Sequence, residues 1–254
     1  SLAQYEKASI HAVTETSKKA TGAGTGVEVL GTEPFTARSH NNPPEGLPDN
    51  AGIFSHKVYR FRAFLPAAFR SLLSEELCTM DERAWNAYPL CKTVITNRRM
   101  AEKDCSVVIR TFHVEGETRE RPNALALPAE LLRIRKVVAL DVTEDGLIGG
   151  RGSPNYSGEE DPKLLRSRAG LGPFPPDWRR TWPGPRLCVY KVVTMRLRGR
   201  LLETRLRRWA LDKTYPTLFA KFHRSALCSV DKWSRLSVAQ LRQEDHKAQK
   251  ELAA

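Results

Sequence analysis

The sequence contains few cysteines, and none of them has a partner at short spacing. A disulfide framework or a structural zinc site needs close pairs such as C-x-x-C, and the chain has no such pair. The six histidines form no H-x-x-x-H or E-x-x-H pair either. We therefore expect free thiols in a reducing compartment and no bound metal. The five cysteines are Cys78, Cys91, Cys105, Cys188 and Cys228.

Long apolar runs are also absent. No stretch approaches the roughly 20 apolar residues that span a bilayer, and the N-terminal residues SLAQYEKASIHAV are too polar for a secretory signal. These absences argue against an integral membrane protein and against secretion. The motifs G-x-S-x-G and H-E-x-x-H and the phosphate-binding P-loop are missing as well. We therefore expect neither an enzyme nor a cofactor.

The charge is unbalanced toward the basic side. The 254 residues include 41 Lys and Arg against 29 Asp and Glu, which gives a formal charge of +12. This excess favours a polyanionic partner, either nucleic acid or an anionic membrane surface; the alternative is a basic surface that only meets solvent. With 41% apolar and 28% charged residues the composition is globular.

Hydrophobic periodicity predicts an α+β fold with a mostly antiparallel sheet. Ser1 and Gln4 have the spacing of a helix cap, and they begin a helix over residues 1–21. The glycines that follow lead into a strand rather than a helix, so they are typical of a turn and not of a phosphate-binding loop. No long helix separates the later strands, which favours antiparallel pairing. These strands are predicted at 53–65, 83–97, 105–114, 136–143 and 187–198.

The C-terminal part of the chain is predicted to be helical. Apolar residues recur at helical spacing from residue 202 onward, and Pro216 should interrupt that helix. Ser237 and Gln240 have the spacing of the cap of a last, polar helix. The Gly- and Pro-rich segment 144–186 is too long for an ordinary connection and is expected to have a function of its own.

Two lysines interrupt the apolar faces of predicted strands. Ser55 and Lys57 share a face with Ile53 and Tyr59, and Lys191 lies in the middle of an apolar row in 187–197. A buried lysine without a partner is costly, so an inward ammonium implies an acid or an anionic ligand. The alternative is that both lysines reach the rim of the sheet or pair with Glu82. Polar residues that could complete an interior site are Glu82, Asn86 and Thr93.

An apolar interior with one cationic end suits an amphiphile that carries a phosphate. Each buried methylene contributes about 0.8 kcal/mol, so two acyl chains of about sixteen carbons need roughly 25 kcal/mol of shelter from water. Only an enclosed site supplies that. A carrier of this kind needs no catalytic group.

Several segments closely resemble the phosphatidylinositol transfer protein family, and they are collinear over almost the whole chain. The segment Ala84-Trp85-Asn86-Ala87-Tyr88-Pro89 and the following Cys91-Lys92-Thr93-Val94-Ile95-Thr96-Asn97 resemble the family signature, in its single-domain, class I form. Further matching segments are 26–30 with Glu33-Pro34, 159–162, 188–194, 222–224 and 231–233.

The resemblance implies a START-like, helix-grip fold in which a curved antiparallel sheet and a long C-terminal helix enclose one phospholipid. It also implies exchange of phosphatidylinositol and phosphatidylcholine between membranes by a cytoplasmic monomer that associates with membranes only transiently. The whole chain would be one such domain, with the first strand of the family apparently missing. The implied inositol phosphate contacts are Ser55, Lys57, Glu82, Asn86, Thr93 and Lys191.

Other positions match the family less directly. Cys91 matches a cysteine near the headgroup, and Asp245 matches an acidic residue of the C-terminal helix. Phe222 matches an aromatic residue suited to choline through a cation–π contact, although its spacing equally suits a helix core. Ser167 matches a phosphorylated serine, and a plain loop serine is the alternative.

The membrane-docking Trp-Trp pair of the family is replaced by Gly199 and Arg200. With Arg196 and Arg198 these residues predict docking by charge on an anionic surface; the alternative is a solvated basic face. A nucleic-acid module would need exposed aromatics among its basic residues, whereas Trp209 and Trp233 have core spacing, so we expect no nucleic acid. A START-like enzyme would have only Glu82 as a catalytic candidate.

Overall fold

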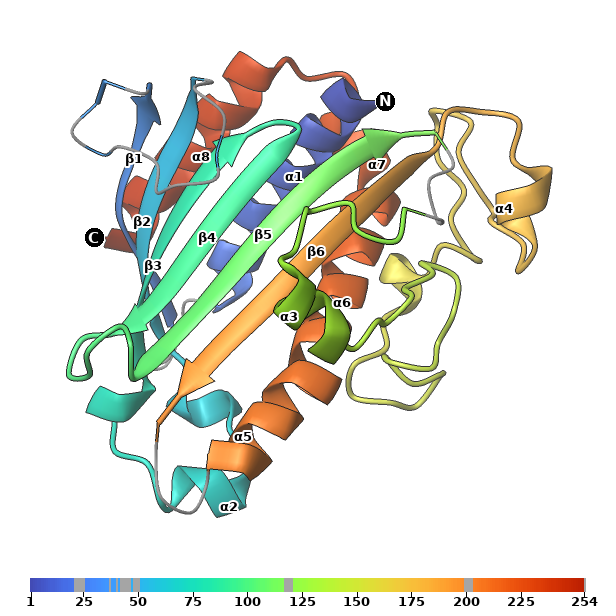
Figure 1. Ribbon diagram of the computed structural model, residues 1–254. Helices are drawn as coiled ribbons and strands as arrows, with labels where there is room; N and C mark the ends of the chain where they lie inside the picture. The colour runs from blue at the N-terminus through green and yellow to red at the C-terminus, as the bar shows by residue number, and fades with distance from the viewer. Residues whose placement is uncertain are drawn as a thin grey trace.

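A six-stranded sheet forms the centre of the molecule (Figure 1). The strands follow one another in chain order from β1 to β6, and every neighbouring pair is antiparallel, as the sequence predicts. Their bounds are β1 (Gly26–Phe35), β2 (Gly52–Arg60), β3 (Thr79–Ala87), β4 (Leu90–Asn97), β5 (Cys105–Glu115) and β6 (Leu187–Leu197). The computed structural model describes residues 1–20, 26–36, 38, 39, 41, 47, 51–116, 121–198 and 203–253.

The helices come mainly from the two ends of the chain. The long ones are α1 (Leu2–Ala20), α6 (Tyr215–Cys228) and α8 (Val238–Ala253). The short ones are α2 (Ala67–Arg70), α3 (Ala129–Ile134), α4 (Trp178–Thr181), α5 (Glu203–Trp209) and α7 (Val230–Trp233). None of the helices in the described part of the chain is both long and apolar enough to cross a bilayer.

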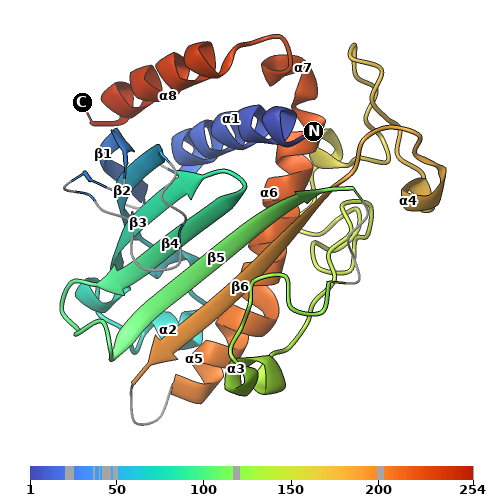
Figure 2. The ribbon, with the colours of Figure 1, turned by 45° about the horizontal axis from the view of Figure 1, so that its top comes forward.

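The long helices lie on one side of the sheet. Figure 1 shows α1 and α6 behind the strands, and Figure 2 shows α1 between the sheet and α8. We call the side of the sheet that faces α6 the inner face; it carries Lys191, whose Nζ lies 5.1 Å from the ring centre of Phe219 in α6. The opposite side is the outer face. Together the curved antiparallel sheet and these helices make an α+β, START-like fold.

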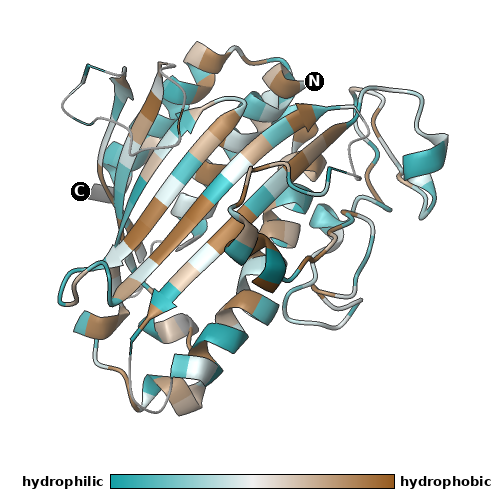
Figure 3. Cartoon of the chain, viewed as in Figure 1, coloured by the Kyte–Doolittle hydropathy of each residue, from teal (hydrophilic) through white to brown (hydrophobic). Residues whose placement is uncertain are grey.

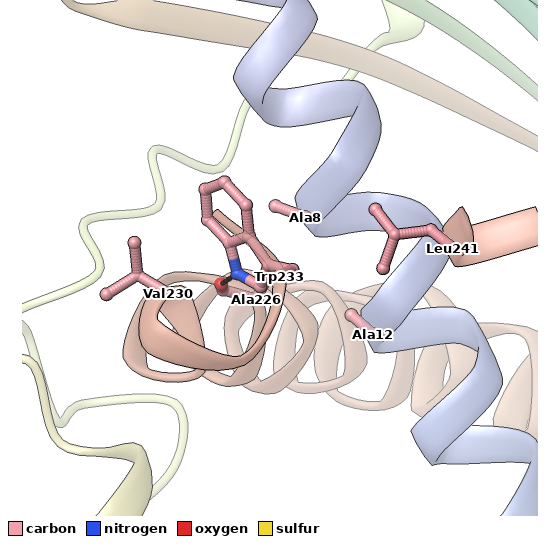
Figure 4. Packing of buried hydrophobic residues seen from close by; sticks show 6 residues of the cluster. All are labelled: Ala8, Ala12, Ala226, Val230, Trp233 and Leu241. Carbon is pink, nitrogen blue, oxygen red and sulfur yellow. Dashed lines mark hydrogen bonds between the residues drawn. The ribbon is translucent and has the colours of Figure 1, made fainter. Parts of the chain in front are cut away.

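A hydrophobic cluster joins the helices to one another (Figure 4). Trp233 lies at its centre and donates from Nε1 to the carbonyl oxygen of Ala226 at 2.8 Å. Burial of aromatic and aliphatic side chains in this way is the main source of stability for such a layer. The buried members of the cluster are Ala8, Ala12, Ala226, Val230, Trp233 and Leu241.

A second cluster lies on the outer face near β1. Phe35, Trp85 and Ala87 are buried there, with Phe54 packed against them. Trp85 donates from Nε1 to the carbonyl oxygen of Asn41 at 2.8 Å, which satisfies the indole in the buried site. Figure 3 shows apolar and polar residues following one another along the strands, as expected for a sheet with two different faces.

Three sequence expectations differ from the structure or are refined by it. The strand predicted over 136–143 is wrong: residues 135–141 have no regular secondary structure, and 135–140 are exposed. The reason is local, because the Asp141 carboxylate accepts hydrogen bonds from the backbone and hydroxyl of Thr143 and closes a turn. The strand predicted over 53–65 ends at Arg60, and the one predicted over 83–97 is a hairpin of β3 and β4.

The helix expectations for the C-terminal part are confirmed. Pro216 lies in the first turn of α6, and a π-helical turn at Ala210–Thr214 separates α6 from α5. The missing amide of proline is tolerated in a first turn, which explains why the helix restarts there. Ser237 and Gln240 cap α8 reciprocally, with distances of 2.8 and 3.2 Å.

Candidate functional site

The residues predicted to hold a headgroup come from four strands and lie on the inner face. Lys57 is directly opposite Glu82, and Thr93 is opposite Ala84, the partner of Ser55. Because successive side chains of a strand alternate between faces, this register puts all of them on one side. The six residues are Ser55, Lys57, Glu82, Asn86, Thr93 and Lys191. The structure thus brings the predicted set to one surface, and its role as a headgroup site stays a prediction.

Glu82 lies at one end of this surface, next to a lysine and two tyrosines. The Tyr59 hydroxyl donates to Glu82 Oε1 at 3.2 Å. Burial raises the pKa of Glu82, while the nearby ammonium of Lys57 and the bond from Tyr59 act in the opposite direction. Burial, and then the Glu82 carboxylate, raise the pKa of Tyr215 in α6. The carboxylate therefore lies in the interior, between the sheet and the start of α6.

Lys191 lies at the other end, opposite Thr111 in the register of β5 and β6. Its Nζ donates to Thr111 Oγ1 at 3.2 Å and lies over the ring of Phe219. Burial lowers the pKa of Lys191 to about 8. A hydroxyl and an aromatic ring stabilise a buried ammonium less than a carboxylate would. An anion placed next to Lys191 would therefore be stabilised.

Aromatic and imidazole rings surround Lys191 from α1, β5 and α6. The Tyr5 ring centre lies 4.9 Å from that of His113 and 5.8 Å from that of His223. Burial, with Lys191 as a further cause, lowers the pKa of His113 to about 4 and that of His223 to about 3. His113 donates from Nδ1 to the carbonyl oxygen of Pro89 at 2.8 Å. Both imidazoles are therefore neutral at pH 7.

Cys91 is buried between these groups. Burial raises the pKa of its thiol to about 12, although the Lys191 ammonium acts in the opposite direction. A thiol with so high a pKa is not nucleophilic at neutral pH. Cys91 thus contributes surface near Lys191 and no covalent chemistry.

Side chains of the inner face retain some accessible surface, although their charged groups are strongly desolvated. Glu82, Lys191 and His223 are only half-buried, yet burial is the main cause of the pKa shift of each. Neither of the two hydrophobic clusters found among the described residues lies between the sheet and α6. Apolar side chains of this face that are also half-buried are Ile95, Ile109, Val193 and Met195. This is the surface that an enclosed ligand would cover.

Phe222 and Asp245 lie away from the inner-face residues. Phe222 packs against the cluster around Trp233, which is the helix-core position that its spacing also allowed. Asp245 accepts a hydrogen bond from Thr14 at 2.6 Å and so joins α8 to α1. Phe219 and Tyr215 are α6 rings that face the interior, near Lys191 and near Glu82.

Two of the four predicted membrane contacts lie in the described chain. Arg196 and Arg198 are exposed at the end of β6, and Arg198 pairs with Asp104 at 3.2 Å. Gly199 and Arg200 lie outside the described residues. Ser167 is half-buried, and its Oγ donates to the carbonyl oxygen of Leu171 at 3.0 Å and accepts from its amide at 2.7 Å.

Sequence reasoning missed several residues of this surface. Thr111 and His113 alternate with Ile109 on one face of a predicted strand, which was a usable signal. Phe219 belongs to the helical stripe of the C-terminal part, but spacing alone does not show which ring faces the sheet. Tyr5 gave no signal, because its partner His223 is 218 residues away. Among the described residues no group of three or more His, Cys, Asp or Glu could hold a metal ion.

The fold and this surface together define a class of protein. A curved antiparallel sheet whose helix-covered face carries charged, half-buried side chains is the arrangement of a START-like lipid-binding domain. The family described as phosphatidylinositol transfer protein matches residues 1–250. The chain therefore belongs to the phosphatidylinositol transfer protein family, as its sequence motifs indicate.

Curated relatives carry the same family name. The phosphatidylinositol transfer protein beta isoform of Homo sapiens is 29% identical over 257 residues, which cover 99% of this chain and 89% of the relative. The beta isoform of Mus musculus is 30% identical over the same length. Membrane-associated phosphatidylinositol transfer protein 1 of Mus musculus is 32% identical over 246 residues, which cover 95% of this chain and 18% of that longer protein.

Proposed function

We propose that this chain holds one phospholipid between the inner face of the sheet and α6, and exchanges phosphatidylinositol and phosphatidylcholine between membranes. The observation that carries the proposal is the inner face itself, where the charged side chains of Glu82 and Lys191 are half-buried and burial is the main cause of their pKa shifts. Closely packed interiors leave no such surface in an ordinary domain. A bound amphiphile would cover it.

In this proposal the lipid phosphate lies at Lys191, the ammonium of the inner face that has a hydroxyl and an aromatic ring beside it. Thr93 and Asn86 lie between Lys191 and the opposite end of the sheet in the register. Ser55, Lys57 and Glu82 would hydrogen-bond the inositol hydroxyls, since together they offer donors and acceptors. The acyl chains would contact the half-buried aliphatic side chains of β4, β5 and β6.

The proposed cycle involves binding and release, without covalent chemistry. The phospholipid is cargo, so no cofactor is required, and the protein acts as a monomer at the cytosolic face of membranes. The exposed Arg196 and Arg198 would face anionic lipids during docking. Movement of the C-terminal helices would open the interior at the membrane.

A transfer assay tests the proposal. Labelled phosphatidylinositol is placed in donor vesicles and its arrival in acceptor vesicles is followed. Lys57→Ala and Asn86→Ala should reduce inositol lipid transfer strongly and phosphatidylcholine transfer less, because both side chains belong to the proposed inositol phosphate contacts on the inner face. Lys103→Ala, at an exposed lysine, is the control and should behave as the parent. Equal phosphatidylinositol transfer by the parent and both inner-face variants would contradict the headgroup assignment.

A further inference from the structure

Two histidines lie near Lys191 in the interior, one on the sheet and one on α6. His113 is directly opposite Val189 in the register of β5 and β6, so it is a diagonal neighbour of Lys191 on the inner face. His223 follows Phe219 by one helical turn, and the Phe219 ring lies next to the Lys191 ammonium. The proposed position of the lipid phosphate is therefore bordered by two imidazoles as well as by an ammonium.

A backbone carbonyl fixes the position of the proton on the neutral His113 ring. Nδ1 lies 2.8 Å from the carbonyl oxygen of Pro89, which can only accept, so the proton is on Nδ1 and Nε2 carries a lone pair. Within the described part of the chain nothing hydrogen-bonds Nε2, and this atom is not among the buried side-chain atoms found there without a partner. The lone pair of Nε2 therefore retains accessible surface in the interior.

A lone pair at this position is unfavourable for a phosphate. Neutral His113 can only accept a hydrogen bond at Nε2, and an ionised lipid phosphate also only accepts. The two groups can bond once Nε2 has taken up a proton, because the imidazolium then donates to the anion. A phosphate charge about 4 Å away favours the protonated ring about a thousandfold at an effective dielectric constant of about 20. A bound phosphate would therefore bring protonation of His113 close to neutral pH.

His223 can bind an anion without this proton. Its Nδ1 lies 3.4 Å from the hydroxyl of Tyr5, which can donate to it. The proton of the neutral His223 ring is then on Nε2, which donates to a phosphate without a change of charge. A second imidazolium would also be repelled by the first, since His113 is one of the causes that lower the pKa of His223. One proton is therefore expected for each bound lipid.

We propose that His113 is a ligand of the phosphate of the bound phospholipid, and that its Nε2 takes one proton from solvent when the lipid enters and returns it when the lipid leaves. The imidazolium and the lipid phosphate then form a neutral pair beside Lys191. The proposal rests on the proposed function, because it requires a phospholipid in this interior. Its consequence is that lipid affinity increases as the pH falls, since the loaded chain binds more protons than the empty one.

Apart from Lys191, the titratable groups near His113 are uncharged at neutral pH or already have a partner. These groups are Tyr5 and Glu6 in α1, Tyr88, Cys91 in β4, Glu115 in β5 and His223 in α6. Burial raises the pKa of both phenols and of the thiol, so these groups stay protonated. Glu6 pairs with Arg242 at 3.1 Å, and Glu115 accepts from a backbone amide of α1. A phosphate beside Nε2 would therefore not compete with a carboxylate that already faces His113.

Calorimetry with short-chain phosphatidylinositol tests this proposal. The delipidated full chain is titrated at pH 6 in buffers of different ionisation enthalpy, and the dependence of the heat on the buffer gives the number of protons taken up per lipid. The parent should take up more than about half a proton, and its affinity should rise at least about tenfold between pH 7 and pH 5. Short-chain diacylglycerol, which has the same acyl chains and no phosphate, should cause no proton uptake.

One substitution removes Nε2 and keeps the bond of Nδ1. His113→Asn leaves an amide that can donate to the Pro89 carbonyl, so its proton uptake should fall to near zero and its affinity at pH 6 should fall about tenfold. His246→Gln, at an exposed histidine of α8, is the matched control and should behave as the parent. Uptake is counted per bound lipid, so an unfolded fraction does not lower it. NMR of the His113 ring in the lipid-loaded parent gives its protonation state without any substitution.

The outcomes distinguish this proposal from the proposed function. Binding of phosphatidylinositol without proton uptake, or uptake that persists in His113→Asn, would overturn the proposal and leave the carrier function intact. A neutral His113 ring in the lipid-loaded parent at pH 6 would overturn it as well. If the delipidated parent binds no phosphatidylinositol at any pH between 5 and 7, the proposed function fails, and this proposal fails with it.

Discussion

Lys191→Met should stabilise the empty protein while weakening its hold on inositol lipid. Burial lowers the pKa of Lys191 from 10.5 to about 8, so the folded chain carries this ammonium unfavourably at pH 7. Methionine has a similar length and no charge. The variant removes the unfavourable charge and, with it, the proposed contact to the lipid phosphate.

The magnitude follows from that change of pKa. A tenfold change in a protonation equilibrium corresponds to about 1.4 kcal/mol, so holding Lys191 charged costs about 3 kcal/mol. Loss of the hydrogen bond to the buried Thr111 hydroxyl offsets about 1 kcal/mol of the gain. The lipid-free variant should therefore be more stable by about 2 kcal/mol.

The pH dependence has a defined sign. Since the folded pKa is below the unfolded one, the unfolded chain binds more protons between pH 8 and 10.5. The stability of the lipid-free parent should therefore rise over this window, and Lys191→Met should lack that rise. Bound anionic lipid favours the charged lysine, so it should reduce the rise in the parent.

Urea unfolding of delipidated protein and mass spectrometry of retained lipid are the assays. Lys57→Met is the matched control with the opposite expected sign, because it leaves the Glu82 carboxylate without its cation. That loss should destabilise the chain by roughly 1–3 kcal/mol. A destabilised Lys191→Met variant, or one that retains phosphatidylinositol as well as the parent does, would refute the reasoning.

Three further predictions concern pH and packing. Because burial lowers the pKa of His113 to about 4 and of His223 to about 3, the unfolded chain takes up protons first as pH falls below 6.5; replacing both with Gln should reduce the loss of stability between pH 6.5 and 4, measured by urea unfolding. Gly52→Ala should lower the free energy of unfolding by about 1–3 kcal/mol, because a Cβ would overlap the carbonyl oxygen of Asn86. Arg224→Met should cost about 3–5 kcal/mol in thermal unfolding, because the guanidinium is 2% exposed and holds two carbonyls and a carboxylate.

Each of these has a result that would contradict it. An unchanged acid slope in the double glutamine variant would show that the imidazoles are not held neutral by the fold. A Gly52→Ala protein as stable as the parent would mean that β2 and β3 can separate at no cost. A small effect of Arg224→Met would mean that the loop at residues 142–145 is not fixed by α6.

Period-2 alternation predicted more of the site than any other pattern in the sequence. It placed Ser55 and Lys57 on one face and Lys191 on the corresponding face of a distant strand, and the register shows that these faces are the same. Alternation was sufficient because only one face of the sheet meets α6. Alternation could not predict which side chains contact these residues, because those contacts depend on the packing of elements that are distant along the chain.

Where prediction failed, tertiary contacts determined the outcome. Residues 136–143 have the aliphatic content of a strand, but the side-chain bonds of Asp141 close a turn at their end, and the residues before it stay exposed. Phe222 and Phe219 are three residues apart on one helix, and only the arrangement of α1, α6 and β6 decides that Phe219 faces Lys191. The predicted interruption of the helix near Pro216 is confirmed, because the effect of proline on a helix depends on the local backbone.

Identification of the lipid that co-purifies with the chain tests the central claim most directly. Native mass spectrometry of the purified protein, followed by extraction, should find one intact phosphatidylinositol or phosphatidylcholine molecule per chain. A chain that purifies with an empty interior and takes up neither lipid from vesicles would contradict the account.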